Sequence, residues 1–228
     1  MNGRPCVLAF FFMPTPEELT MKSRNLLFSA LVLSVCVSGA SAEINISWGP
    51  GGHLDGTEFA DSWLVDDGSA FGDRGNGYNY GWFNGAGDPD PQDANRNRNN
   101  AASPSELYDT LNHMRKGDVN SWKIEIPNGE YNVHLVAGDP NHTDQENDIN
   151  VVGGSMSVLI DDEGDGNNFD EFDITITVDE GFLQLVPVEA ANNQKVSHMS
   201  ITAVPEPGSI VLAVFGLLGL FGLARRRR

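Results

Sequence analysis

Cysteine and positive charge are the two features this sequence has least of. Only two cysteines occur, Cys6 and Cys36, and both precede the expected folded domain, which therefore has no disulfide and no thiol chemistry. Residues 44–204 contain 28 of the 32 acidic residues but only 7 of the 14 Lys and Arg residues. Such a surface repels phosphate backbones, so no nucleic-acid partner is expected. It suits cations, a neutral polyhydroxylated ligand, or solubility alone.

Recognisable catalytic motifs are missing as well. The sequence has no G-x-S-x-G and no H-E-x-x-H. Its five histidines are scattered, without the spacing of metal ligands. Carboxylates are so abundant that no pair of them indicates glycosidase chemistry. We therefore expect a protein that is not an enzyme.

A secretory signal peptide is predicted at residues 21–42. Two basic residues precede an apolar run that is too short to span a membrane, and an A-x-A cleavage sequence follows. We expect cleavage between Ala42 and Glu43, and interpret residues 1–20 as a start-site extension. Lipidation at Cys36 is the alternative.

The C-terminal segment has three parts in order: a Pro-Glu-Pro sequence, an apolar stretch at 208–224 and an arginine cluster. Seventeen residues of helix span roughly 25 Å, just under the ~30 Å hydrocarbon core, and snorkelling arginines make a transmembrane helix feasible. The arginines hold the C-terminus in the cytoplasm, which leaves the domain at 43–204 outside. The motif residues are Pro205, Glu206, Pro207, Arg225, Arg226, Arg227 and Arg228.

This tail, 205–228, resembles the PEP-CTERM sorting signal. The resemblance implies processing by an exosortase-type membrane enzyme, in a Gram-negative bacterium that makes exopolysaccharide. It indicates delivery to the cell envelope or the extracellular matrix rather than an activity. A plain C-terminal anchor is the alternative.

Apolar residues alternate with polar ones through the second half of the domain. The alternating segments are 122–126, 131–137, 156–160, 172–178, 182–188 and 199–203. Turn residues separate them, such as Pro-Asn-Gly-Glu at 127–130. Many short strands with such turns predict an all-β fold, an antiparallel β-sandwich over residues 43–204.

Residues 103–117 fit two structures. A capping-box pattern at 103–106 and a stripe of Leu107, Leu111 and Met114 suit a helix. Alternation of Tyr108, Thr110, Asn112 and Met114 suits a strand, which we favour.

Three segments, 64–82, 108–114 and 122–140, resemble the galactose-binding-like and malectin-like jelly rolls that accompany polysaccharide-active enzymes. The resemblance implies a jelly-roll fold with the segment at 108–114 as a strand, and it says little about the ligand.

The acidic segment 161–167 is a candidate calcium site. Calcium prefers oxygen ligands at alternating positions, with a glycine at the turn. Asp161, Glu163 and Asp165 supply the oxygens and Gly166 supplies the turn. An EF-hand is excluded because Phe172 stands where its last carboxylate belongs. A solvated acidic turn is the alternative.

Aromatic residues cluster near position 80 among glycines and asparagines, a pattern typical of sugar sites, where rings stack on the sugar and polar groups bind its hydroxyls. If Tyr78, Tyr80 and Trp82 share one face of a strand, Asn79 and Phe83 take the other. Trp63 and Trp122 are expected in the core. The predicted sugar-binding residues are Arg74, Asn76, Tyr78, Asn79, Tyr80 and Trp82.

Together these features predict an exported, exosortase-sorted domain that binds neutral polysaccharide without catalysis. The alternatives are a structural or adhesive matrix protein without a specific sugar ligand, and a small polysaccharide hydrolase or lyase.

Overall fold

The computed structural model describes residues 43–205, apart from 117, 163–165 and 190. The predicted signal peptide and the apolar stretch at 208–224 lie outside these residues. Within the described part of the chain, no helix is long and apolar enough to cross a membrane.

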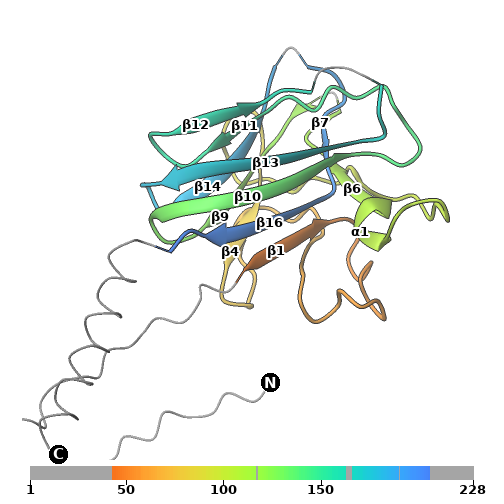
Figure 1. Ribbon diagram of the computed structural model, residues 1–228, viewed down its shortest axis with the longest axis horizontal. Helices are drawn as coiled ribbons and strands as arrows, with labels where there is room; N and C mark the ends of the chain where they lie inside the picture. Colours follow the sequence, from red (N-terminus) through yellow and green to blue (C-terminus); the bar gives the residue numbers. More distant parts are fainter. Residues whose placement is uncertain (1–42, 117, 163–165, 190, 206–228) are drawn as a thin grey trace, which may run out of the picture. The chain divides into compact units, whose positions relative to one another are not determined.

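Two β-sheets form the body of the domain (Figure 1). Sheet A has the strand order β13-β10-β16-β1-β2, and sheet B has the order β12-β11-β14-β9-β4-β3. Sheet A consists of β1 (Ile44–Trp48), β2 (Leu64–Asp66), β10 (Gly129–Gly138), β13 (Phe169–Val178) and β16 (His198–Ala203). Sheet B consists of β3 (Gly72–Asp73), β4 (Asn79–Phe83), β9 (Ser121–Glu125), β11 (Ile149–Val152), β12 (Ser157–Ile160) and β14 (Phe182–Pro187).

Smaller elements cover one end of the two sheets. They are β5 (Asn95–Asn97), α1 (Glu106–Asp109), β6 (Thr110–His113), β7 (Arg115–Lys116), β8 (Asp118–Val119) and β15 (Lys195–Val196). Strands β15, β6 and β5 pair in that order, and β7 pairs with β8. Every described strand pair is antiparallel except β1 with β2.

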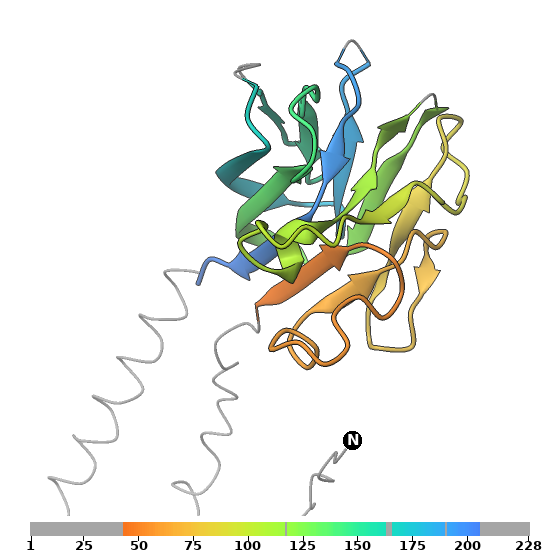
Figure 2. The same ribbon diagram turned by 90° about the vertical axis from the view of Figure 1, so that its right-hand side faces the viewer.

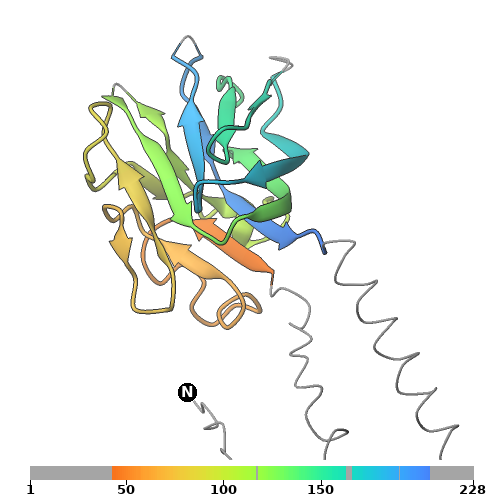
Figure 3. The same cartoon turned by 90° about the vertical axis from the view of Figure 1, so that its left-hand side faces the viewer.

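The core lies between the two sheets, because alternate side chains of each strand point inward. Sheet A contributes Ile46, Val133 and Met199, and sheet B contributes Trp122 and Leu185, all fully or almost fully buried. The core cluster comes entirely from residues within 44–201, so this part of the chain encloses its own core. The predicted all-β class and antiparallel sandwich are confirmed, and Figures 2 and 3 show the domain from its two sides.

The ambiguous segment contains both predicted structures. A single helical turn spans Glu106–Asp109, and a strand spans Thr110–His113. Ser105 caps the turn without a side-chain hydrogen bond, so the capping box of the helical alternative does not form. The helix ends at Asp109, whose buried carboxylate accepts hydrogen bonds from Asn100 N and Ser103 Oγ.

A network of ion pairs and hydrogen bonds connects the loops at the end of the domain opposite residues 43 and 205. Arg98 Nε donates to Asp139 Oδ1 at 2.9 Å, and Lys195 Nζ lies 3.6 Å from Asp139 Oδ2 and donates to Gln145 Oε1 at 3.0 Å. Burial acts to raise the pKa of Asp139, but the hydrogen bonds from Arg98 and Asn141 N and the charges of Lys195 and Arg98 together outweigh it, so the pKa lies below its usual value. Burial lowers the pKa of Lys195. The network joins segments up to about 100 residues apart in the sequence.

Strands β1 and β16 are antiparallel neighbours, with Ile44 opposite Ile201. The first residue of the described domain and the last residues before the tail therefore lie at the same end of sheet A.

Candidate functional site

The predicted sugar-stacking residues of β4 divide between the two faces of sheet B. Tyr80 is 2% exposed and Trp82 is fully buried, both within the core cluster. The prediction that these two rings stack on a sugar is therefore wrong. Alternation places Asn79 and Phe83, the residues on either side of them, on the outer face, where both are half-buried.

A buried carboxylate explains the orientation of this strand. Asp66 is fully buried and accepts the indole N–H of Trp82 at 2.8 Å and of Trp122 at 2.7 Å. Burial raises the pKa of Asp66, while these hydrogen bonds and one from Gly68 N act against it. The two tryptophans must point inward to satisfy this acceptor, because a buried carboxylate without donors is strongly destabilising.

The guanidinium of Arg74 is held by backbone carbonyls and an aromatic ring. Its Nε donates to Tyr80 O at 2.9 Å, its Nη2 donates to Ser69 O at 2.9 Å, and the guanidinium lies 4.8 Å from the centroid of the Tyr80 ring. The carboxylate of Asp66 lies 3.9 Å from its Nη2. Gly81 permits this arrangement, because a Cβ there would lie 2.5 Å from Arg74 Nη2. Two of its five N–H donors are engaged with backbone carbonyls and its side chain is 15% exposed, so Arg74 holds the strand in place.

The other predicted sugar-binding residues lie at the surface but make local contacts. Asn76 Nδ2 donates to the hydroxyl of Tyr80 at 3.2 Å, and Asn79 Nδ2 donates to Glu125 Oε2 at 2.7 Å. Tyr78 is half-buried and packs against the core. The six residues therefore do not form one site.

The predicted calcium ligands lie only partly in the described chain. Asp161 is exposed, whereas Glu163 and Asp165 fall outside the described residues. Among the described side chains, no group of three or more His, Cys, Asp or Glu residues is arranged to hold a metal ion. Calcium binding stays a prediction.

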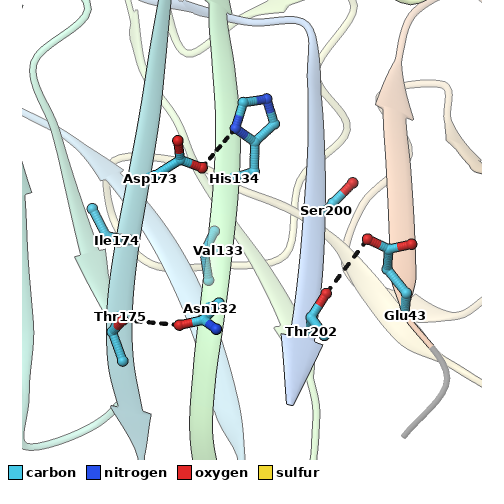
Figure 4. A pocket seen from close by; sticks show the side chains of 9 residues that line it. All are labelled: Glu43, Asn132, Val133, His134, Asp173, Ile174, Thr175, Ser200 and Thr202. Carbon is cyan, nitrogen blue, oxygen red and sulfur yellow. Dashed lines mark hydrogen bonds and ion pairs between the residues drawn. The ribbon is translucent and has the colours of Figure 1, made fainter. Parts of the chain in front are cut away.

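The outer face of sheet A carries a shallow pocket of about 340 Å³ that the sequence analysis did not single out (Figure 4). It crosses β13, β10 and β16 and reaches the residue before β1. Its lining is mostly short polar side chains: Glu43, Asn132, Val133, His134, Asp173, Ile174, Thr175, Ser200 and Thr202.

Cross-strand hydrogen bonds order these side chains. His134 Nδ1 bonds to Asp173 Oδ1 at 2.9 Å, and Thr175 Oγ1 donates to Asn132 Oδ1 at 2.9 Å (Figure 4). Thr202 Oγ1 donates to Glu43 Oε1 at 3.4 Å. Each of these groups is at least partly exposed, so the pocket presents donors and acceptors to solvent in fixed positions.

A cluster of rings borders this pocket on the same face of sheet A. The rings of Tyr108 and His198 are 4.7 Å apart, and those of Trp63 and His198 are 5.6 Å apart. His134, which lines the pocket, lies 6.5 Å from His198, so pocket and rings are continuous. The ring cluster consists of Phe59, Trp63, Tyr108, His134, Phe169 and His198.

Of the two tryptophans expected in the core, one lies there and the other does not. Trp122 is in the core as expected, but Trp63 is half-buried and packs on the outer face of sheet A.

Burial and a hydrogen bond to Glu171 raise the pKa of Tyr108 to about 12. Burial lowers the pKa of His198 to about 4. Both rings are therefore neutral near pH 7, and the cluster offers apolar ring surface rather than charge.

The domain ends at β16, and the chain continues directly into the Pro-Glu-Pro segment. Residues 203–228 match the PEP-CTERM protein-sorting motif. The match implies export, sorting to the envelope or the extracellular space, and processing by an exosortase. It covers the tail alone and says nothing about the ligand of the domain.

Similarity of the domain itself to known proteins is distant. No curated protein matches the chain. Similar solved structures include the plant peptide RALF23 in complex with FER and LLG2 (14% identity, TM-score 0.47) and a calcium-binding mutant of Bacteroides uniformis β-glucuronidase 2 (16% identity, TM-score 0.45). They also include a CBM35 from Paenibacillus barcinonensis (13% identity, TM-score 0.28).

The matched parts differ in length. The similarity covers 73%, 72% and 37% of this chain, and 41%, 18% and 71% of the three other chains, in the same order. The chain therefore spans less than half the length of the first two. Likenesses this distant carry over no ligand and no activity.

Proposed function

We propose that residues 43–205 form a non-catalytic carbohydrate-binding domain whose site is the outer face of sheet A. The observation that carries the proposal is the continuity of the polar pocket with the ring cluster through His134. A sugar presents hydroxyls, which both donate and accept hydrogen bonds, and an apolar C–H face. The pocket supplies the first kind of partner and the rings supply the second.

The charges of the face favour a neutral glycan. Glu43 and Asp173 line the pocket, and Glu171 lies beside it, bonded to the hydroxyl of Tyr108 at 2.7 Å. Among the residues that line the pocket, His134 alone carries a ring nitrogen, and it is paired with Asp173. An anionic sugar would meet these carboxylates without a compensating cation, whereas carboxylates accept hydrogen bonds readily from neutral hydroxyls.

The same contacts support a binding role over catalysis. Ser200 lies opposite His134 on the neighbouring strand, and His134 pairs with Asp173, which superficially suggests a hydrolytic triad. However, Ser200 Oγ donates to Asn45 Oδ1 at 2.6 Å. Its proton is therefore directed away from the imidazole, and the serine is not activated as a nucleophile.

Delivery follows from the two ends of the chain. In this proposal the signal peptide at 21–42 is removed, the helix at 208–224 anchors the tail with its arginines in the cytoplasm, and exosortase processing releases the domain toward exopolysaccharide. The sandwich is a galactose-binding-like jelly roll. Since Glu43 and Thr202 both line the pocket, the proposed site lies near the two ends at which processing occurs.

A matched pair of charge-removing variants tests the proposal. Asp173 and Glu130 are both exposed acids on the outer face of sheet A, but only Asp173 lines the pocket. Using residues 43–205 and an array of neutral glycans, Asp173→Asn is expected to weaken binding by about tenfold, the loss of one hydrogen bond to a charged group. Glu130→Gln should leave binding unchanged. Absence of binding to every neutral glycan would overturn the proposal and favour the scaffold alternative.

A further inference from the structure

The outer face of sheet B carries an arrangement that the proposed function does not use. The Nζ of Lys123 lies 4.7 Å from the ring centroid of Phe71, 4.7 Å from that of Phe83 and 5.2 Å from that of Phe182. These four residues are named the lysine–phenylalanine cage. We propose that the cage binds a carboxylate-bearing sugar of an acidic polysaccharide, on the face opposite the neutral-sugar site.

Strand alternation fixes the cage on the outer surface. Trp122 and Ile124, on either side of Lys123 in β9, are fully buried, and Leu183, next to Phe182 in β14, is also buried. Lys123 and Phe182 therefore point away from the core. In Figure 1 the strands β14, β9 and β4 lie behind β13, β10, β16 and β1, so the cage and the pocket of Figure 4 face in opposite directions.

The charge of Lys123 has no carboxylate to neutralise it. Arg74, Arg98 and Lys195 each have a carboxylate within 4.0 Å, but among the described residues none lies that close to Lys123 Nζ. Arg96, Arg115 and Lys116 also lack a carboxylate that close among the described residues, but Lys123 differs from them in having three aromatic rings around its ammonium. The ring faces stabilise the ammonium instead, since a cation is attracted to the negative face of an aromatic ring.

The cage also fixes the ammonium before any ligand binds. A free lysine side chain loses much rotamer freedom when it forms an ion pair, whereas the three rings already restrict Lys123. A carboxylate can therefore pair with it at a lower entropic cost. The three phenylalanines are each partly exposed and offer apolar contact to the sugar ring that bears the carboxylate.

Neighbouring side chains extend this surface along sheet B. Gln184 pairs across the strands with Lys123, and its Nε2 donates to Ser121 Oγ at 3.1 Å. Val152 follows in the same cross-strand row, next to Gln184. Glu125, two residues after Lys123 on the same face of β9, accepts a hydrogen bond from Asn79 Nδ2 at 2.7 Å. The row from the cage through Gln184 to Val152 thus offers an amide and apolar surface, free of described acids, along which a polysaccharide chain can lie.

The proposal rests on the proposed function only in treating the domain as a glycan binder, and two ligands separate them. Titration of residues 43–205 with oligogalacturonate is expected to show binding that Lys123→Met weakens by about tenfold or more, the value of one charge-assisted hydrogen bond. Lys116→Met removes the same charge from an exposed lysine outside the cage and should change the affinity less than about twofold.

Further variants guard against trivial explanations. Lys123→Arg should retain most of the affinity, and the melting temperature of each variant shows whether it folds. Neutral-glycan binding at sheet A should not respond to Lys123→Met. No binding of oligogalacturonate by the intact domain, or equal losses in Lys123→Met and Lys116→Met, would overturn the cage proposal and leave the neutral-sugar site standing. If the intact domain binds oligogalacturonate but no neutral glycan, the neutral-sugar site is overturned and the cage proposal stands.

Discussion

Two adjacent aromatic residues of β4 provide the sharpest test of the structure. Trp82 is fully buried, whereas Phe83 is half-buried on the outer face of sheet B. Replacing each of them by alanine removes a large ring from the same strand. The two effects on stability should differ strongly, because only one ring fills the core.

The expected magnitudes follow from the contacts. Truncating a buried tryptophan to alanine destabilises by about 3–5 kcal/mol. Trp82→Ala also removes a donor from the buried Asp66, which adds about 1–3 kcal/mol. Phe83→Ala loses the partial burial of the ring, a ring contact with Phe71 and one cation–π contact with Lys123, together about 2 kcal/mol.

Thermal and urea unfolding of residues 43–205 would measure the difference. For a domain of this size 1 kcal/mol shifts the melting temperature by about 2–4 °C. Trp82→Ala should therefore lower it by about 10 °C or more, and Phe83→Ala by a few degrees. If Trp82→Ala does not fold, Trp82→Phe keeps most of the ring but loses the N–H donor, and should be destabilised by about 1–3 kcal/mol. Equal losses in the two alanine variants, or a larger loss at Phe83, would refute the orientation of β4.

Four further predictions follow from the structure and the sequence. Burial lowers the pKa of His113 and of His198 to about 4. Between pH 6.5 and 4 the unfolded chain binds protons that the folded chain does not, so the free energy of unfolding should decrease as the pH is lowered, by about 2 kcal/mol per histidine from pH 7 to 5. Urea midpoints independent of pH would contradict this. Lys195→Met should destabilise by about 3 kcal/mol because it leaves Gln145 Oε1 and one side of the Asp139 network without a donor, and an unchanged midpoint would show that the network contributes nothing. Millimolar calcium should raise the melting temperature relative to chelator, by the equivalent of about 2.7 kcal/mol at 100 times its dissociation constant, and Asp161→Asn should remove that rise; a melting temperature that calcium leaves unmoved rejects the site. N-terminal sequencing of the exported protein should begin at Glu43, and a lipidated Cys36 would disprove the predicted cleavage.

The two proposed sites suggest how the domain would work after export. One outer face carries a polar pocket and neutral rings, and the other carries an ammonium among three phenylalanine rings. A domain with both could join two polysaccharide chains of different charge. Adding the domain to a mixture of a neutral and an acidic polysaccharide should aggregate the two glycans, and this aggregation would require both faces.

Strand alternation let the sequence predict most of the fold. The apolar positions of 131–137 and 199–203 lie in β10 and β16, and their side chains reach the core as expected. This works because each residue's direction in a strand is fixed by its neighbours in sequence. The tail was recognisable for a related reason: its three parts act through order and composition, and need no tertiary structure.

The candidate sites depended on information that the sequence pattern does not contain. Alternation required that Trp82 and Phe83 point in opposite directions, but which of them faces the core was decided by Asp66, 16 residues away, and by Trp122 beyond it. The polar pocket joins His134 to Asp173 across 39 residues, and the cage joins Phe71 to Phe182 through Lys123.

The sequence by itself therefore determined the all-β class, the acidic surface and the sorting tail, because composition and short-range periodicity are local properties. Only the tertiary structure decided which face of each strand is covered, and so which rings and hydrogen-bonding groups meet at the surface. Strand pairing and sheet packing set those contacts, since they bring together side chains that no spacing along the chain connects.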